Sequence, residues 1–462
     1  MNGFVKGGLV LGGLVLGLGA LRRALNPTPR YAPWEKPPYG EFEKKVLILG
    51  GGFGGYTAAT DVCRLTKSRD DVGVLVIARD NFFTFWPMVP GIVSSDIDAR
   101  NVAQPLRRAL ILAGASFRRA KVHGIDPERR VVKADGGLEF PYDQLIVSLG
   151  GQPNFFGIPG VEEHSLTMRG VEDAERVRNR VIERFEEVSL IRDEVPDSKL
   201  TFVVIGAGAT GVEVASEIHS LVHENLAPDY PNIDPYRVRI YLLEALPNIL
   251  PELDPALRRA ARTRLLNERI EVMTGAMAEE ITGNCVKLKG GEQIETENVI
   301  WTAGNRPNQA VQDLGLPYDH RTGIKVDLTL RVEGQNDIWA IGDCAAVEDV
   351  HKEGAIVPPT AQAAIQQGHL AARNVLKTID GEGDLKEFEY KPLGQLVELG
   401  SDFAVNEVMG VRFTGQLAAV FWRLAYLVRL NSPQSKVRVA ADWIVGIFLR
   451  PAVTQIRGTS DE

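Results

Sequence analysis

Two copies of one glycine pattern, far apart in the sequence, constrain the fold of this chain more than any other feature. The first copy follows the apolar run at 46–49 and consists of Gly50, Gly52 and Gly55. The second follows the apolar run at 202–205 and consists of Gly206, Gly208 and Gly211. A G-x-G-x-x-G pattern between a buried strand and a helix brings backbone N–H groups and the helix N-terminus against a pyrophosphate. The repetition therefore predicts an α/β protein with two Rossmann-like domains, which hold two dinucleotides and pass electrons between them.

Size, charge and cysteine content exclude several classes of protein. A chain of 462 residues is too long for one compact core, so we expect two or three domains. The formal net charge of -8 argues against a nucleic-acid partner. The three cysteines are widely spaced and odd in number, which predicts a reducing compartment and no disulfide framework. No C-x-x-C spacing occurs, so we expect no metal site of the zinc or iron–sulfur kind.

An uncharged run of Gly, Leu, Val and Ala covers residues 7–21, between Lys6 and the pair Arg22 and Arg23. It is shorter than the roughly 20 apolar residues that cross a bilayer, although its flanks can extend it. A signal anchor, a cleaved signal peptide and a helix in the membrane plane are three interpretations. No A-x-A cleavage site follows the run and two arginines do, so we favour a membrane anchor over residues 1–25. The arginines predict that the body of the protein lies at the cytoplasmic face of the cell membrane.

Residues 26–44 are rich in proline and are expected to form a linker between the anchor and the first domain. A unit of strand, glycine turn and helix is expected to begin at residue 45, and a second such unit at residue 199. Between them, a charged amphipathic helix is expected over 171–188. Near the C-terminus, aromatic residues recur at helical spacing with arginines between them; they are Phe421, Trp422, Tyr426, Trp443 and Phe448. This pattern is typical of helices in a membrane interface, and packing against the protein core is the alternative.

An acidic residue at the end of the strand after the glycine turn can accept hydrogen bonds from a ribose 2′-OH. Glu244 has this place in the second unit. A carboxylate there repels a 2′-phosphate, so we expect NADH rather than NADPH; a solvated loop residue is the alternative. Ala78 has the matching place in the first unit, and the nearest carboxylate, Asp80, comes two residues later.

The run from residue 45 to about residue 457 resembles the two-dinucleotide-binding flavoproteins, and most closely the type II NADH dehydrogenases (NADH:quinone oxidoreductases). The segments that carry the resemblance are 50–55, 142–150, 210–213, 301–304, 340–345 and 361–366, of which the last is similar to that family's A-Q-x-A-x-Q quinone-site motif. The resemblance implies an FAD-binding domain in two parts, 45–160 and 311–386, interrupted by an NADH-binding domain at 161–310. It also implies a C-terminal membrane-associating segment at 387–462.

The resemblance implies a role for each residue that matches a family motif. The residues expected to contact FAD are Gly50, Gly52, Phe53, Gly54, Gly55, Val122, Gly150, Asp343 and Ala361. Asp343 is expected to hydrogen-bond the ribityl chain. The residues expected to contact NADH are Gly206, Gly208, Gly211, Glu244, Ala303 and Gly304.

Three residues are candidates for catalysis at the quinone. Gln362 and Gln366 are spaced i, i+4 on one face of a predicted helix. Their neutral amides can hydrogen-bond quinone carbonyls without charging an apolar tunnel, and a structural role is the alternative. Glu213 is a candidate for proton delivery to the quinone. The alternative interpretation is a structural role, in which Glu213 is an acidic residue near a helix N-terminus that the helix dipole stabilises.

Together these features predict a membrane-associated enzyme that transfers two electrons from NADH through FAD to a membrane quinone. No proton pumping is expected, because the one candidate span holds no ionisable residue. Two alternatives stay open. One is a related flavoenzyme with another donor or acceptor, such as sulfide or a soluble carrier. The other is a non-catalytic subunit of a membrane complex, which Ala78 motivates. The oligomeric state stays open too, with a homodimer as one option.

Overall fold

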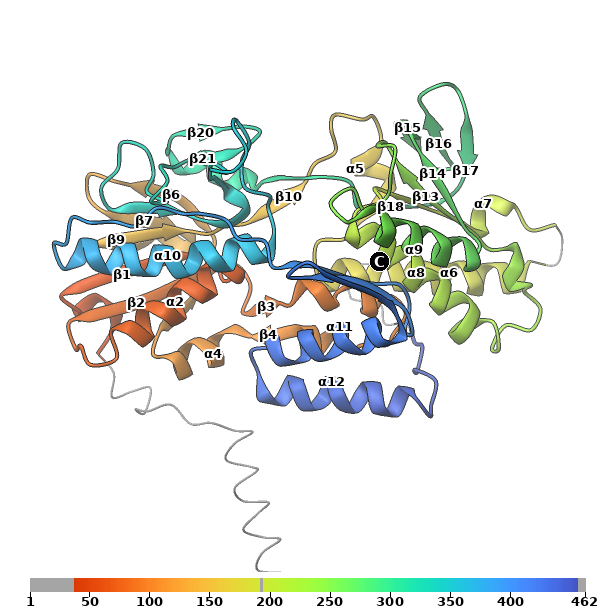
Figure 1. The fold of residues 1–462 in the computed structure, drawn as a ribbon, viewed down its shortest axis with the longest axis horizontal. Coiled ribbons are helices and arrows are strands. Elements are labelled where there is room, and N and C mark those ends of the chain that lie inside the picture. Colours follow the sequence, from red (N-terminus) through yellow and green to blue (C-terminus); the bar gives the residue numbers. More distant parts are fainter. Residues whose placement is uncertain (1–36, 192–193, 456–462) are drawn as a thin grey trace, which may run out of the picture.

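The computed structural model describes residues 37–191 and 194–455, in which two α/β units lie side by side with a C-terminal segment beneath them (Figure 1). The anchor predicted over 1–25 and residues 26–36 of the predicted linker lie outside these ranges, as do residues 456–462. Within the described ranges, no helix has both the length and the apolar character needed to cross a bilayer.

The first unit contains a parallel five-stranded sheet with the order β22-β9-β1-β2-β5. Its strands are β1 (Lys44–Leu49), β2 (Val72–Ala78), β5 (Ser116–Arg119), β9 (Gln144–Val147) and β22 (Ile338–Ala340). β1 ends in four buried apolar residues and β9 is buried throughout, as expected for a parallel sheet covered on both faces. Two long helices, α2 (Phe53–Leu65) and α10 (Ala361–Ile379), pack against each other beside this sheet. Because β22 and α10 come late in the chain, two separate stretches of sequence build this unit.

The second unit repeats the plan with the strand order β11-β18-β12-β13-β14, again all parallel. Its strands are β11 (Ser165–Thr167), β12 (Thr201–Ile205), β13 (Arg239–Glu244), β14 (Ile270–Thr274) and β18 (Asn298–Trp301). Its main helices are α6 (Val171–Leu190), α8 (Ala209–Ser220) and α9 (Pro255–Asn267). In both units the glycine turn lies at the carboxyl end of a central strand, where ligands bind in open α/β sheets.

Smaller elements surround the two sheets. The short helices are η1 (Tyr39–Glu41), η2 (Trp86–Met88), η3 (Pro90–Ile92), α3 (Ala99–Val102), α4 (Leu106–Ala113), η4 (Asp135–Gly137), α5 (Val161–His164), α7 (Asp197–Leu200), η5 (Leu221–Leu226), η6 (Pro235–Arg237), η7 (Gln309–Leu314) and η8 (Gly342–Cys344). The other strands are β3 (Phe82–Thr84), β4 (Ala103–Pro105), β6 (Val122–Asp126), β7 (Val131–Ala134), β8 (Leu138–Pro141), β10 (Gly151–Pro153), β15 (Ala278–Thr282), β16 (Cys285–Leu288), β17 (Gln293–Glu295), β19 (Asn305–Pro307), β20 (Tyr318–Asp319), β21 (Gly323–Lys325) and β23 (Ala345–Ala346).

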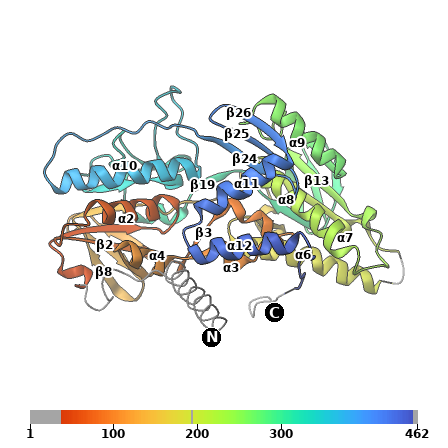
Figure 2. The ribbon, with the colours of Figure 1, turned by 60° about the horizontal axis from the view of Figure 1, so that its bottom comes forward.

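The C-terminal segment is a three-stranded antiparallel sheet followed by two helices. These elements are β24 (Gly394–Glu398), β25 (Ala404–Val408), β26 (Val411–Gly415), α11 (Gln416–Arg429) and α12 (Pro433–Gly446). α11 packs on β25 and β26, while α12 packs on α11 and α3. Figure 2 shows that both helices lie across the junction of the two α/β units.

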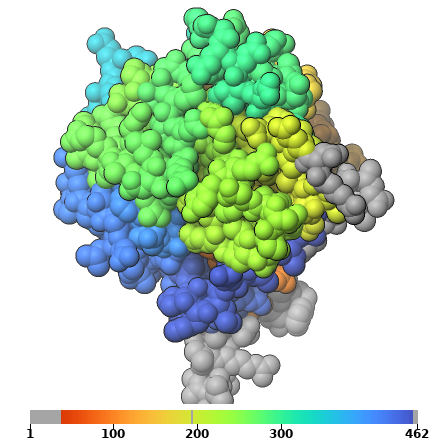
Figure 3. Space-filling view, turned by 90° about the vertical axis from the view of Figure 1, so that its right-hand side faces the viewer, coloured from red at the N-terminus to blue at the C-terminus, as the bar shows by residue number. Residues whose placement is uncertain are grey.

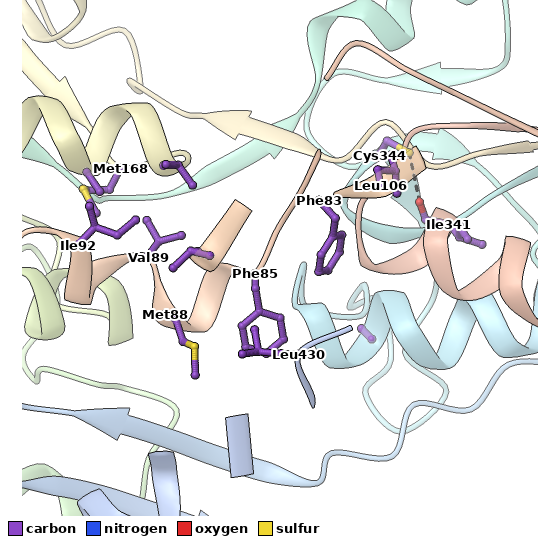
Figure 4. Close-up of a cluster of buried hydrophobic side chains, with 14 of the residues drawn as sticks. Phe83, Phe85, Met88, Val89, Ile92, Leu106, Met168, Ile341, Cys344 and Leu430 are labelled. Carbon is purple, nitrogen blue, oxygen red and sulfur yellow. Dashed lines mark hydrogen bonds between the residues drawn. The ribbon is translucent and has the colours of Figure 1, made fainter. Parts of the chain in front are cut away.

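The apolar segment around η2 and η3 joins the C-terminal helices to the first unit. Phe83, Phe85 and Met88 are buried there, and Leu430, which follows α11, lies beside Phe85 (Figure 4). One continuous core extends from the first sheet through this segment to α11. The C-terminal helices are therefore held in a fixed position relative to both glycine turns.

Candidate functional site

The first glycine turn has two glycines that are needed for packing and one that faces open space. A Cβ on Gly50, which has φ +103°, would lie 2.0 Å from the Ser148 carbonyl oxygen. A Cβ on Gly55 would lie 2.1 Å from the Gly50 carbonyl oxygen. Gly52 has an ordinary extended backbone, and no heavy atom lies within 4 Å of where its Cβ would be. This open space at the N-terminus of α2 suits the pyrophosphate predicted there, and its binding stays a prediction.

The second glycine turn has the same arrangement. A Cβ on Gly206, again at φ +103°, would lie 2.7 Å from the Ala303 Cα, so Ala303 packs directly on the turn. A Cβ on Gly211 would lie 1.8 Å from the Gly206 carbonyl oxygen. Gly208 has open space around its Cβ position, as Gly52 does in the first unit. Both turns are therefore shaped to admit a phosphate group over the middle glycine.

Phe53 and Gly54 have roles in packing. The Phe53 ring lies 4.8 Å from the Phe83 ring, edge to face, so its side chain points into the apolar core. A Cβ on Gly54 would lie 3.3 Å from the Ala364 carbonyl oxygen of α10, so Gly54 allows α2 and α10 to approach each other. Of these two residues, only the backbone can reach a phosphate.

Asp343 lies at the edge of a cavity of about 140 Å³ that Gly342, Thr360 and Ala363 also line. Its carboxylate accepts a hydrogen bond of 2.7 Å from the Asn305 amide, and burial raises its pKa above the ordinary aspartate value. The turn before it is fixed because the Gly342 N–H donates to the Gln367 side-chain oxygen at 2.6 Å. The cavity and its carboxyl group suit the ribityl chain of FAD that the family resemblance implies there.

Other predicted FAD contacts lie around these two features. Ala361 begins α10 directly after Thr360, whose hydroxyl caps that helix, and Val122 begins β6. Gly150 follows β9 and adopts a positive φ of +69°. These placements keep the predicted contacts near the carboxyl edge of the first sheet, and their role in binding stays a prediction.

Sequence reasoning missed three polar residues near Asp343. Asn305 and Gln367 hold the Asp343 turn, as described above. The Arg169 guanidinium donates to the Gly151 carbonyl, and it interacts with the charge of Asp343 although it belongs to the second unit. Gln367 directly follows the 361–366 motif, and this position could have identified it as a candidate site residue. Asn305 and Arg169 lie in no motif, and only the fold brings them together.

Glu244 lies directly beneath the second glycine turn. One carboxylate oxygen accepts the Ala207 N–H at 2.8 Å, and the other accepts the Leu246 N–H at 2.9 Å. Both bonds come from the backbone, so the carboxylate is held at the strand end where a ribose is expected.

The first unit has an apolar contact at the matching place. A Cβ on Gly51 would lie 2.3 Å from Leu106 Cδ2 and 3.5 Å from the Ala78 methyl carbon. Asp80 instead forms an ion pair of 3.0 Å with Arg79. In the first unit, a packed apolar surface made by Ala78 and Leu106 therefore takes the place of the usual acidic residue.

The wall predicted to face the nicotinamide carries an aromatic ring. A Cβ on Gly304 would lie 2.6 Å from Phe156 Cζ, and the Phe156 side chain is 62% exposed. Phe156 therefore covers Gly304, and Ala303 lies behind it against the glycine turn. This aromatic neighbour was not predicted from the sequence.

Gln362 and Gln366 share one face of α10, as predicted, and both contact the chain segment 391–394. The Gln362 amide donates to the Gly394 carbonyl at 2.6 Å and accepts the Leu393 N–H at 3.1 Å. The Gln366 amide donates to the Lys391 carbonyl at 2.8 Å and accepts the Lys391 N–H at 3.1 Å. These bonds support a structural role for both residues, and their contact with quinone stays a prediction.

Glu213 lies on α8, just after the second glycine turn. It is 9% exposed, and its carboxyl accepts the Glu398 N–H at 3.2 Å. Burial raises its pKa well above the ordinary glutamate value, which favours the protonated form of the carboxyl group. A protonated carboxyl is the form that can donate a proton.

Comparisons with known proteins agree with this geometry. A family model described as pyridine nucleotide-disulphide oxidoreductase matches residues 44–368. A probable NADH dehydrogenase of Dictyostelium discoideum is 31% identical over 87% of this chain and 89% of that protein. A type II NADH:quinone oxidoreductase of Mycobacterium tuberculosis is 29% identical over 90% of each chain. The structure of NDH2 from Plasmodium falciparum in complex with NADH has the same fold, with a TM-score of 0.80 at 19% identity, over 89% of this chain and 100% of that one.

Proposed function

The chain belongs to the pyridine nucleotide-disulphide oxidoreductase family, and from this premise we propose that it is a type II NADH:quinone oxidoreductase that uses FAD. The observation that carries the proposal is the pair of glycine turns with matching geometry, each open over its middle glycine. Two such turns suit two dinucleotides. The relatives supply the identity of the donor, NADH, and of the acceptor, a quinone.

The residues present fit FAD in the first unit and NADH in the second. Gly52 and the N-terminus of α2 would hold the FAD pyrophosphate, and Asp343 would hold its polyol chain. Gly208 and Glu244 would hold the pyrophosphate and ribose of NADH. When bound, FAD takes two electrons from NADH and passes them to the quinone. The chain itself positions the two nucleotides, and the expectation of no proton pumping stays a prediction.

Membrane association is part of this proposal and rests on the C-terminal helices. We define the C-terminal apolar face as Leu417, Val420, Leu424, Val428, Ile444, Ile447, Phe448 and Leu449, all of which are exposed. The exposed fraction is 82% at Leu417 and 79% at Phe448. Large exposed apolar stripes of this kind mark membrane or protein contact sites. Figure 3 shows the C-terminal residues, in blue, at the bottom of the molecule below the second unit, in green.

Two of the aromatic residues predicted for the membrane interface belong to the protein core instead. Trp422 is 3% exposed, and the Tyr426 ring contacts both Trp422 and Phe85. Phe421 and Phe448 remain exposed, as the interfacial interpretation requires. A quinone dissolves in the bilayer, so an apolar face on these helices supports access from lipid. The predicted homodimer and cytoplasmic location stay predictions.

The positions of the cysteines argue against the sulfide alternative, which needs cysteines on both sides of the flavin. Cys63 lies on α2, Cys285 on β16 and Cys344 in η8, so they come from three separate elements. The Cys344 thiol is fully buried and contacts the Ile341 carbonyl at 3.3 Å. Burial raises its pKa to about 11, so it is a poor nucleophile at neutral pH.

A spectroscopic experiment tests the proposed function. The purified full chain is expected to show a flavin spectrum that anaerobic NADH bleaches and a short-chain quinone restores. Sulfide in place of NADH is expected to leave the spectrum unchanged. A colourless protein after incubation with FAD would support the non-catalytic alternative, and bleaching by sulfide would support the sulfide alternative.

Glu244→Gln is expected to weaken the preference for NADH over NADPH. The amide cannot accept both backbone N–H groups, and its neutral charge no longer repels a 2′-phosphate. We expect kcat/KM for NADH to fall by roughly tenfold, the effect of about 1.4 kcal/mol, while kcat/KM for NADPH falls less or rises. Steady-state kinetics with both nucleotides measure the ratio. Glu271→Gln is the control, because Glu271 is a half-exposed partner of Arg239 on the next strand. An unchanged ratio in Glu244→Gln would contradict this role.

A further inference from the structure

Four carboxyl groups lie where α8, β24, α11 and the loop after η3 meet, and one guanidinium, that of Arg423, faces three of them. We define the carboxyl cluster as Asp96, Glu213, Glu217 and Glu398. Glu213 accepts the Glu398 N–H at 3.2 Å, and Arg423 forms an ion pair of 3.3 Å with Glu398. Asp96 interacts with the charges of Glu217, Glu398 and Arg423. Glu217 is only 4% exposed, and η3 packs directly on α8.

The cluster has more carboxyl groups than cations. Arg423 is the cation that faces Asp96, Glu217 and Glu398, and one guanidinium balances one carboxylate. Burial raises the pKa of all four carboxyl groups, and that of Glu398 to about 8. Burial therefore favours the protonated form of these carboxyl groups, because several buried charges without partners are costly.

One oxygen of the cluster has no partner within the described residues. Glu217 Oε2 is buried and makes no hydrogen bond, and neither does the Ser95 hydroxyl beside Asp96. The other oxygen of the Glu217 carboxyl group forms a hydrogen bond with the Ser94 side chain. A proton or a water molecule on Oε2 would satisfy it, which is independent support for a site that takes up protons.

The cluster has neighbours on its solvent side and along β24 in the direction of the predicted quinone site. On its outer side, exposed Glu224 of η5 interacts with Asp96, and the Asn225 amide holds the Ser94 carbonyl at 2.8 Å. Asp402 also faces Glu224 there. On its inner side, β24 runs from Glu398 to Gly394, which Gln362 contacts. A strand rises about 3.3 Å per residue, so Glu398 lies roughly 13 Å from that contact. The Tyr426 hydroxyl, on α11, faces Glu213 and Glu398.

We propose that Asp96, Glu217 and Glu398 form a proton-input path from solvent at Glu224 to Glu213. The path rests on the proposed function. The overall reaction, NADH + H⁺ + quinone → NAD⁺ + quinol, moves two electrons and consumes one proton from water. The other proton of the quinol comes from NADH. When Glu213 gives up its proton toward the quinone, Glu398 replaces it, and Glu217 and Asp96 are reloaded from the solvent.

Glu217→Gln in the full-length, FAD-loaded enzyme tests the path. Glutamine keeps the shape of the side chain but cannot pass on an acidic proton. We expect kcat with quinone to fall by roughly tenfold or more at alkaline pH, within the range that a positioned acid contributes, and to approach the wild-type value at acidic pH. The rate at which NADH bleaches the flavin should stay unchanged. A small acid that is still protonated at alkaline pH, such as the ammonium ion, should restore kcat in this variant and leave the wild type unaffected.

Glu268→Gln is the matched control. Glu268 is a buried glutamate on α9 with a pKa raised to about 7 by burial, and it bonds Ser216 of α8 at 2.8 Å. It lies outside the path, so its replacement is expected to keep the wild-type pH profile of kcat. A loss of kcat at alkaline pH in Glu268→Gln as well would indicate a general effect of buried charge and would overturn the path.

A second measurement does not depend on turnover. A buried carboxyl with a folded-state pKa near 8 stabilises the fold fully below its unfolded pKa of about 4.3, and this stability is lost as the pH rises through 8. The melting temperature of the wild type should therefore fall over this interval, and Glu217→Gln should reduce the fall. The infrared band of protonated carboxyl groups should weaken in the same variant. If neither changes, the cluster does not store protons. If the wild type fails to reduce quinone although the melting temperature and the infrared band change as expected, the proposed function is wrong, but the carboxyl cluster still holds protons.

Discussion

Gly52→Val is expected to give a folded protein that does not retain FAD. The backbone at Gly52 has φ −75° and ψ −167°, which valine adopts without strain, and its side chain meets no protein atom within 4 Å. The added methyl groups instead fill the space that a pyrophosphate needs. Loss of two hydrogen bonds to a charged group costs about 3 kcal/mol, so we expect FAD affinity to fall by roughly a hundredfold or more. The flavin absorbance of the purified protein and its melting temperature without FAD measure binding and folding separately.

Gly208→Val is the matched control for that substitution. It places the same side chain over the same open space in the second unit, at φ −71° and ψ −174°. This variant is expected to remain yellow, to be reduced by dithionite, and to lose reduction by NADH. A full complement of FAD in Gly52→Val would contradict the assignment of the first glycine turn to the FAD pyrophosphate. Loss of FAD from both variants would show that the two turns are not separate sites.

The glycine turns were predictable from sequence because their cause is local. Gly50 is required by its positive φ, and Gly55 by its contact with the Gly50 carbonyl oxygen within the turn; a strand-to-helix turn of this kind has few other solutions. The two parallel sheets follow from the same pattern, because apolar strands such as β9 and β12 must be covered on both faces. For these parts of the chain, short-range sterics and hydrophobic patterning specify the same structure.

The candidate quinone site was predictable only in part. The spacing of Gln362 and Gln366 correctly indicates that they share a helix face, since a helix places i and i+4 together. Their bonding partners come from residues 391–394, beyond the end of α10, and no periodicity identifies a partner at that distance in sequence. Trp422 shows the same limit, because helical spacing cannot distinguish a core face from a membrane face.

The carboxyl cluster could not be predicted from the sequence at all. Asp96 follows a short helix, Glu217 lies within α8 and Glu398 ends β24, and none of them belongs to a motif. Each is an ordinary acidic residue until the fold removes it from water. Only the packing of the C-terminal sheet on α8 places them around Arg423 and raises the pKa of each carboxyl.

Glutamate at three positions of the C-terminal apolar face is expected to release the protein from membranes. The combined variant Leu417→Glu, Leu424→Glu and Val428→Glu changes residues that are 82%, 56% and 71% exposed, so the fold should be retained. Each apolar side chain contributes about 2 kcal/mol when it enters lipid, so three contribute about 6 kcal/mol, and vesicle affinity should fall by more than a thousandfold. The added negative charges strengthen this loss. Co-sedimentation with lipid vesicles measures it.

Leu138→Glu is the control for this variant, because Leu138 is 46% exposed on β8 of the first unit and belongs to none of the C-terminal elements. It should bind vesicles as the wild type does. The triple variant should still oxidise NADH with a water-soluble short-chain quinone, because both glycine turns and α10 are unchanged. Its activity with a long-chain quinone embedded in vesicles should be lost, since that substrate reaches the enzyme only from the bilayer. Retained binding and retained activity with the embedded quinone would mean that this face is not the membrane contact and that access begins elsewhere.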